Sequence, residues 1–148
     1  MKNFTMAAAF AVLAAPAFAA GHASSQGDAA AGEEQFNRQC VACHVVQDAS
    51  GEILAGRNAK TAGPNLFAFA GRPVASAEGF RYGDSIAEVG ARGDVWTEES
   101  FVEYVQNPTD WLRETLEDRR ARGKMAYQVR EEAQAYDLYA FLSTFTAE

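Results

Sequence analysis

The feature that most constrains this chain is a pentapeptide that contains both of its cysteines. Cys40 and Cys43, followed directly by His44, form the pattern C-x-x-C-H. This pattern is the attachment motif for c-type haem. One helical turn between the cysteines sets the separation at which their thiols add to the two vinyl groups of a porphyrin, and His44 then reaches the iron. The sequence therefore predicts covalent haem at Cys40 and Cys43, with His44 as the proximal axial ligand.

Two other kinds of site share part of this pattern. A thioredoxin-like redox pair also uses C-x-x-C, but it follows a strand in an alternating strand–helix sequence, whereas here a predicted helix leads into Cys40. A zinc site would need a fourth ligand beside Cys40, Cys43 and His44, and no second cysteine pair exists. Both alternatives stay open at this point, and haem is the stronger prediction.

The first residues have the composition of an export signal. A cationic start at Lys2 precedes the apolar, alanine-rich run 4–15, and Ala17-Phe18-Ala19 forms an A-x-A cleavage site. The run is shorter than the roughly 20 apolar residues that span a bilayer. We expect a signal peptide over 1–19, cleaved after Ala19 or Ala20, a flexible leader over 20–27 and one domain over 28–148. The predicted location is the periplasm, with no membrane span after cleavage.

The sixth iron ligand is predicted by elimination. Removal of Met1 and Met6 with the signal leaves Met125 as the last methionine, and the other candidates are His22, a lysine or no ligand. His22 lies in the leader. Met125 follows Gly123 in a predicted loop rather than in a periodic apolar pattern, so we favour a distal axial ligand over a core side chain. With both axial positions filled, the iron suits electron transfer rather than catalysis.

Helix signals are clear at both ends of the domain. Asp28 caps a helix that runs to about Gln39, Thr97 caps another, Pro108 opens a third and Glu131-Glu132 open the last. A short helix is expected over 84–89, and no strand of useful length is expected in the glycine-rich stretch 45–95. The predicted fold class is all-α, with three to five helices and long loops. So much irregular backbone needs an apolar cofactor to complete the core.

Several segments together resemble one family. They are GEEQFNRQCVACH, TAGPNLFAFAGR, FRYGDSIAEVGARGDVWTEE, YVQNPTDWL, GKMAY and YDLYAFLSTF. The chain resembles the class I c-type cytochromes and, within them, the large type of the bacterial cytochrome c2 family. The resemblance implies the cytochrome c fold around one covalently bound haem c.

The resemblance also implies roles for single residues. Gly32 and Phe36 would pack the first helix against Phe141 of the last, and the Pro64 carbonyl would accept a hydrogen bond from His44. The haem propionates would contact Arg72, Tyr82 and Trp96. The Tyr104 hydroxyl would meet the Met125 sulfur, and Tyr127 would lie beside the exposed haem edge.

The function implied is a soluble, monomeric electron carrier rather than an enzyme. It would take electrons from a cytochrome bc1 complex and deliver them to a photosynthetic reaction centre or a terminal oxidase such as cytochrome c oxidase. Two alternatives stay open: a cytochrome dedicated to one periplasmic dehydrogenase, and a haem enzyme with an open sixth site. With 13 basic and 20 acidic side chains, a net charge of −7 argues against a nucleic-acid binder.

The distribution of charge suggests how such a carrier would dock. Basic side chains gather around the methionine segment and one loop, although the chain as a whole is acidic. We expect a basic haem edge that steers docking to acidic partner surfaces, against the alternative of a solvated loop. Its predicted members are Arg57, Lys60, Arg119, Arg120, Arg122 and Lys124.

Overall fold

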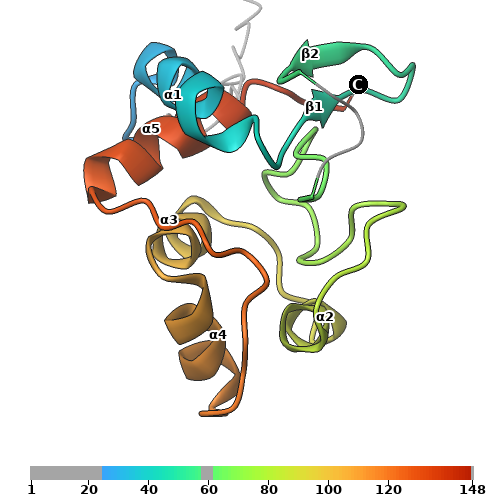
Figure 1. Ribbon diagram of the computed structural model, residues 1–148, viewed down its shortest axis with the longest axis vertical. Helices are drawn as coiled ribbons and strands as arrows, with labels where there is room; N and C mark the ends of the chain where they lie inside the picture. Colours follow the sequence, from blue (N-terminus) through green and yellow to red (C-terminus); the bar gives the residue numbers. More distant parts are fainter. Residues whose placement is uncertain (1–24, 58–61, 148) are drawn as a thin grey trace, which may run out of the picture.

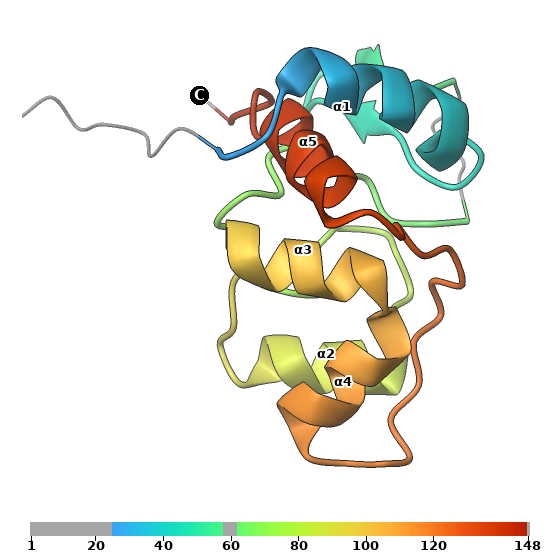
Figure 2. The same ribbon diagram turned by 90° about the vertical axis from the view of Figure 1, so that its left-hand side faces the viewer.

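The computed structural model describes residues 25–57 and 62–147, so the predicted signal peptide, His22 and Lys60 lie outside the described residues. Helix α1 (Ala29–Gln35) continues into a π-helical turn, η1 (Phe36–Cys40), and lies across α5 (Glu132–Leu142). Below this pair, α3 (Glu98–Gln106) leads into α4 (Pro108–Leu116), and α2 (Asp84–Ala91) lies beside them (Figures 1 and 2). Among the described residues the regular structure is mainly α-helical, with long connecting loops and one small sheet, as the predicted all-α class implies.

The predicted helix starts are confirmed. The Asp28 carboxylate accepts hydrogen bonds from the backbone of Ala30 at 2.8 Å and Ala31 at 3.3 Å. The Thr97 hydroxyl accepts from the Ser100 N–H at 3.1 Å, and the Ser100 hydroxyl accepts from the Thr97 N–H at 3.0 Å. These bonds satisfy N–H groups that have no partner inside the helix. Pro108 is the first residue of α4, where its missing N–H costs nothing.

The glycine-rich stretch contains a small antiparallel hairpin that the sequence did not predict. Strand β1 (Val46–Gln47) pairs with β2 (Ile53–Ala55). The Asp48 carboxylate closes the turn between them by accepting the N–H groups of Ser50 at 2.9 Å and Glu52 at 2.8 Å. Strands of two and three residues are too short to show an alternating pattern, so the sequence gives no periodic signal for them.

Close contact between α1 and α5 fixes the upper part of the molecule. A Cβ atom on Gly32 would lie 2.0 Å from the Asp137 carbonyl oxygen and 2.8 Å from the Phe141 Cβ. One turn further along, the rings of Phe36 and Phe141 pack with their centroids 5.5 Å apart. The structure therefore confirms the packing that the resemblance implied for Gly32, Phe36 and Phe141.

The remaining chain wraps the helices and closes the lower part. After α4, the segment 117–131 (orange in Figure 1) returns past α3 to the start of α5. At the other end, the Ser25 hydroxyl donates to the Glu98 carboxylate at 2.6 Å, which holds the last residues of the predicted leader against α3. Over the part of the chain that the structure describes, no helix combines the length and hydropathy needed to cross a membrane.

Candidate haem site

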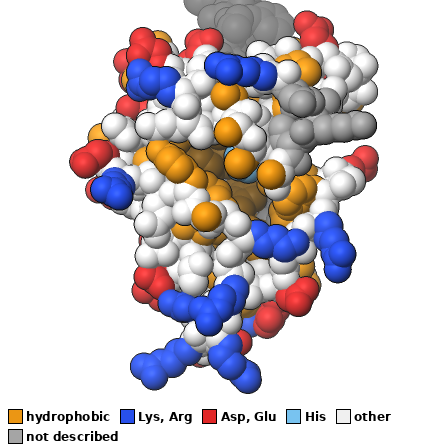
Figure 3. All heavy atoms as spheres, in the orientation of Figure 1, with side chains coloured by type: hydrophobic (Ala, Val, Ile, Leu, Met, Phe, Trp, Pro, Cys, Tyr) orange, Lys and Arg blue, Asp and Glu red, His pale blue; other side chains and the backbone are white. Residues whose placement is uncertain are grey.

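A cavity of about 560 Å³ opens on the face shown in Figure 3, where apolar side chains line a central hollow. Its walls come from η1, α3, α5 and the loops between them, and they include Phe69, Phe101 and Leu142. The volume lies within the range of sites for a cofactor-sized ligand. Every residue predicted to bind the haem or its iron lines this cavity, namely Cys40, Cys43, His44, Pro64, Arg72, Tyr82, Trp96, Tyr104 and Met125.

The attachment motif forms one tight turn at the end of η1. The N–H groups of Cys43 and His44 both donate to the Cys40 carbonyl oxygen, at 3.0 Å and 2.8 Å. The two thiols form no disulfide with each other, and burial raises the pKa of Cys40 to about 11. Reactive cysteines of thioredoxin-like pairs have lowered pKa values, so the raised pKa of Cys40 argues against that alternative. Among residues 25–57 and 62–147, no group of three or more His, Cys, Asp or Glu side chains could hold a metal such as zinc.

His44 is oriented by its backbone surroundings. Its Nδ1 lies 3.0 Å from the Pro64 carbonyl oxygen, the contact that the resemblance implied. A carbonyl only accepts, so the proton lies on Nδ1 and the lone pair of Nε2 is left to bind a metal. Burial also lowers the pKa of His44, which favours the neutral ring that ligation needs. Gly63 makes room for this ring, since a Cβ there would lie 2.4 Å from the His44 Cε1.

Met125 reaches the same cavity from the segment after α4. It is half-buried, and its neighbours are tied to the surrounding elements on both sides. The Lys124 ammonium donates to the carbonyl oxygens of Arg81 at 2.9 Å and Tyr82 at 3.2 Å. The Val129 N–H donates to the Val105 carbonyl oxygen in α3 at 2.8 Å. These bonds hold the methionine segment as a wall of the cavity.

One part of the cavity lining is suited to bind a carboxylate group. The Arg72 guanidinium donates through Nη1 to the Phe67 carbonyl oxygen at 2.9 Å and through Nη2 to the Asn65 carbonyl oxygen at 3.1 Å. Its Nε is buried and has no acceptor among the described residues. A buried donor without a partner is costly, so this atom fits the carboxylate of a haem propionate. Tyr82 lies close by and accepts the Ala77 N–H at 3.2 Å.

Three aromatic rings support another part of the cavity wall. Trp96 packs on Tyr104 with the ring centroids 5.1 Å apart and on Trp111 at 5.7 Å, and Tyr104 meets Trp111 at 5.4 Å. Burial raises the pKa of Tyr104 to about 12, so its hydroxyl keeps its proton and remains a hydrogen-bond donor at neutral pH. Trp111 has no predicted site role, and it braces the two predicted residues.

Comparison with known proteins decides the family. The family model described as Cytochrome c matches residues 29–146. The chain belongs to the cytochrome c family. Within that family it belongs to the class I cytochromes of the cytochrome c2 type. Two relatives and one solved structure support this assignment.

The relatives cover almost the whole domain. Cytochrome c2 of Rhodovulum adriaticum is 58% identical over 118 residues, which cover 80% of this chain and 92% of that protein. Cytochrome c2 of Cereibacter sphaeroides is 48% identical over 143 residues, covering 96% and 92%. A crystal structure of cytochrome c2 from Rhodobacter sphaeroides superposes with a TM-score of 0.78 at 44% identity, covering 83% of this chain and 99% of that one.

Family membership fixes the cofactor and the general activity. Cytochromes c of this type carry one covalently bound haem c and transport electrons. The cavity fits that group, since it combines an apolar lining with two thiols, a neutral imidazole and an unpaired buried donor.

Sequence reasoning missed Gly63, which directly precedes Pro64. It predicted Lys124 as a docking residue, but it did not predict the hydrogen bonds by which Lys124 holds the methionine segment.

Proposed function

We propose that this cytochrome is a periplasmic one-electron carrier, with His44 and Met125 as the two axial ligands of its iron. The observation that carries the proposal is that both side chains line the cavity into which Cys40 and Cys43 also face. When bound, the haem supplies one reversible electron through its iron. A second axial ligand would leave no position for oxygen, peroxide or a substrate, so we propose no enzymatic activity.

The protein's own residues would hold the iron in nearly the same geometry in both oxidation states. The Pro64 carbonyl fixes the His44 ring, and Lys124 holds the chain next to Met125. Around a bound haem the apolar walls would keep water away, which would limit reorganisation when charge changes. A thioether ligand favours Fe(II) and raises the reduction potential, which suits an acceptor of electrons from a quinol-oxidising complex.

For partners we propose a cytochrome bc1 complex as donor and a photosynthetic reaction centre or a terminal oxidase as acceptor. The protein would act as a monomer that diffuses between them. Names of the relatives support a cytochrome c2, and the signal-like start at 1–19 supports export. Tyr127, 42% exposed and lining the cavity, is proposed to lie beside the haem edge through which electrons pass.

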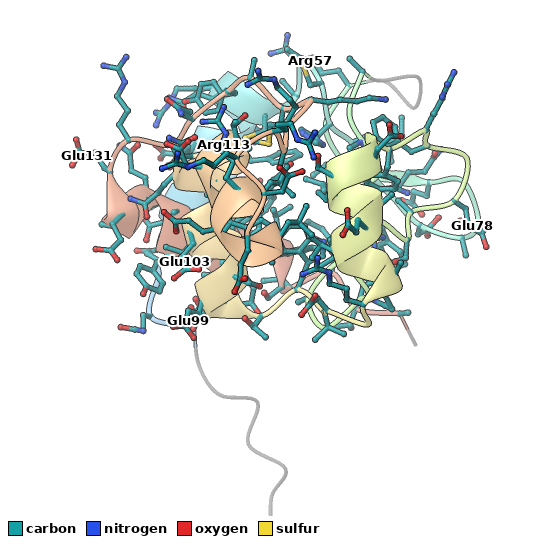
Figure 4. The ribbon with its side chains drawn as sticks, turned by 90° about the horizontal axis from the view of Figure 1, so that it is seen from below. Arg57, Glu78, Glu99, Glu103, Arg113 and Glu131 are labelled. Atoms are coloured by element: carbon teal, nitrogen blue, oxygen red, sulfur yellow. The ribbon has the colours of Figure 1, made fainter. Side chains whose placement is uncertain are left out.

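Charges on the cavity face support docking to an acidic surface. Figure 3 shows Lys and Arg side chains below the hollow, and the segment 117–123 forms the lower end of the molecule in Figure 1. Of the predicted docking residues that the structure describes, Arg57, Arg119, Arg120 and Arg122 are exposed away from the cavity lining, and Lys124 lines it. Seen from below, Arg57 lies toward the cavity face and Glu99 toward the opposite side (Figure 4).

Replacement of the proposed distal ligand tests the function directly. We expect the oxidised wild-type haem protein to show the red charge-transfer band of a methionine–iron bond, and Met125→Ala to lose it. Because the thioether stabilises Fe(II), the reduction potential of the variant should fall by on the order of 0.1 V or more. Gln128→Ala, an exposed change in the same segment, is the matched control and should keep both properties. High-spin, open-site haem in the wild type would contradict the proposal.

A further inference from the structure

A chain of side-chain hydrogen bonds joins the haem-attachment segment to the methionine segment without passing through the iron. Among the described residues Gln35 is the only polar one that is almost completely buried, with 3% of its surface exposed. Its Nε2 donates to the Gln39 Oε1 at 3.3 Å and to the Gln134 Oε1 at 3.4 Å. A buried amide must find such partners, so Gln35 fixes the side chain of Gln39.

Gln39 in turn holds an aromatic ring 88 positions further along the chain. The Tyr127 hydroxyl donates to the same Gln39 Oε1. Gln39 directly precedes Cys40, and Tyr127 lies two residues after Met125. This contact therefore connects the segment that would carry the covalent haem to the segment that would carry its distal ligand.

The Gln39–Tyr127 pair, together with Ala126, lies where two spaces adjoin. Both residues line the haem cavity, and both line a second, more polar cavity of about 440 Å³ that faces solvent between the methionine segment and α5. Parting the two side chains would join these spaces and open a path for water or a small ligand toward Met125. The pair thus lies where the cavity could open to solvent beside Met125.

We propose that Gln39, fixed by Gln35, is a positioning residue that holds Tyr127 and keeps the methionine segment closed. The expected effect on the iron rests on the proposed function, because it assumes that Met125 is the ligand that opening of the segment would affect. The hold of Gln39 on residues 125–129 is a property of the protein itself, and it is measurable whichever atom binds the iron.

The test compares four variants of the haem-loaded protein. Gln39→Leu removes the acceptor and Tyr127→Phe removes the donor while keeping the ring. Gln39→Glu keeps an acceptor oxygen at the same place, and Gln128→Leu is a control in the same segment. Hydrogen exchange at the amides of 125–128 should quicken about two- to tenfold in the first two variants, the range expected for loss of one hydrogen bond. The last two should match the wild type.

The double variant of Gln39→Leu and Tyr127→Phe should exchange no faster than either single one, because both remove the same contact. Unchanged exchange in Gln39→Leu, or equal acceleration in Gln39→Glu, would overturn the proposal.

Imidazole binding to the oxidised protein separates this inference from the proposed function. If Met125 is the ligand, imidazole enters only after the segment opens, so its binding rate should rise by the same factor as exchange. If the wild type lacks the methionine–iron band and imidazole binds equally fast to all variants, the assignment of Met125 fails. The exchange result then still decides the role of Gln39.

Discussion

At the scale of single residues, Gly63 decides whether His44 can sit where the iron needs it. A Cβ at this position would lie 2.4 Å from Cε1 and 2.7 Å from Nδ1 of the His44 ring. Because the ring is held by the Pro64 carbonyl, Gly63→Ala must push it away or strain the backbone. We expect the holoprotein to lose about 1–3 kcal/mol of stability in denaturant unfolding, with a larger fraction of haem lacking a proximal histidine.

Gly83 provides the matched control for that change. It lines the same cavity and has an ordinary backbone φ of −79°, and the atoms nearest to a Cβ there belong to the Lys124 side chain, at an ordinary contact distance of 3.4 Å or more. Gly83→Ala should therefore cost less than Gly63→Ala and leave the visible spectrum unchanged. Equal losses in the two variants would mean that crowding of His44 is not the cause.

At the scale of elements, the contact between α1 and α5 reverses an ordinary helix preference. Within a helix, alanine is favoured over glycine by about 1 kcal/mol. At Gly32, however, a Cβ would lie 2.0 Å from the Asp137 carbonyl oxygen, so the two helices would have to separate. Gly32→Ala should thus destabilise the protein by about 1–3 kcal/mol in thermal or denaturant unfolding.

An exposed neighbour in the same helix shows how much helix propensity alone changes the free energy of unfolding. Ala31 is exposed on α1, so Ala31→Gly should cost only about 1 kcal/mol from propensity. If Gly32→Ala instead stabilised the protein by a similar amount, close packing of α1 on α5 would be ruled out as the reason for this glycine.

The elements that sequence reasoning predicted are those whose signals are local. Asp28, Thr97 and Pro108 mark helix starts by chemistry within three or four residues, and the structure places each of them at a helix start. The turn of the β1–β2 hairpin is local too, since Asp48 accepts N–H groups from Ser50 and Glu52, but a turn alone does not show that strands flank it. Its strands are too short for any period to show.

The same distinction applies to the site. Cys40 to His44 form one contiguous motif, and Met125 followed from elimination, whereas the partner of His44 at Pro64 came from the resemblance. The contact of Gln39 with Tyr127 spans 88 positions and joins two polar residues of common types. No local pattern marks such a pair, so only the folded arrangement of α1, α5 and the methionine segment brings it to light.

At the scale of the whole molecule, an acidic protein presents basic side chains on the face that holds the haem cavity. The net charge is −7, yet Arg119 and Arg122 are exposed in the segment 117–123, which forms the lower end of the molecule in Figure 1. A local positive field speeds encounter with an acidic partner and is screened by salt. Arg122→Glu should therefore slow the second-order reaction with a purified cytochrome bc1 complex about threefold or more at low ionic strength.

A compensating substitution on the opposite side of the molecule distinguishes the effect of net charge from the effect of the local basic side chains. Glu99 lies away from the cavity face (Figure 4), so combining Arg122→Glu with Glu99→Arg restores the net charge of −7 without restoring the basic patch. If docking depends on the patch, the double variant should stay as slow as Arg122→Glu, and both should approach the wild-type rate at about 1 M salt, where the screening length is about 3 Å. Recovery of the wild-type rate in the double variant at low salt would show that overall charge governs the encounter and that the basic segment is simply solvated.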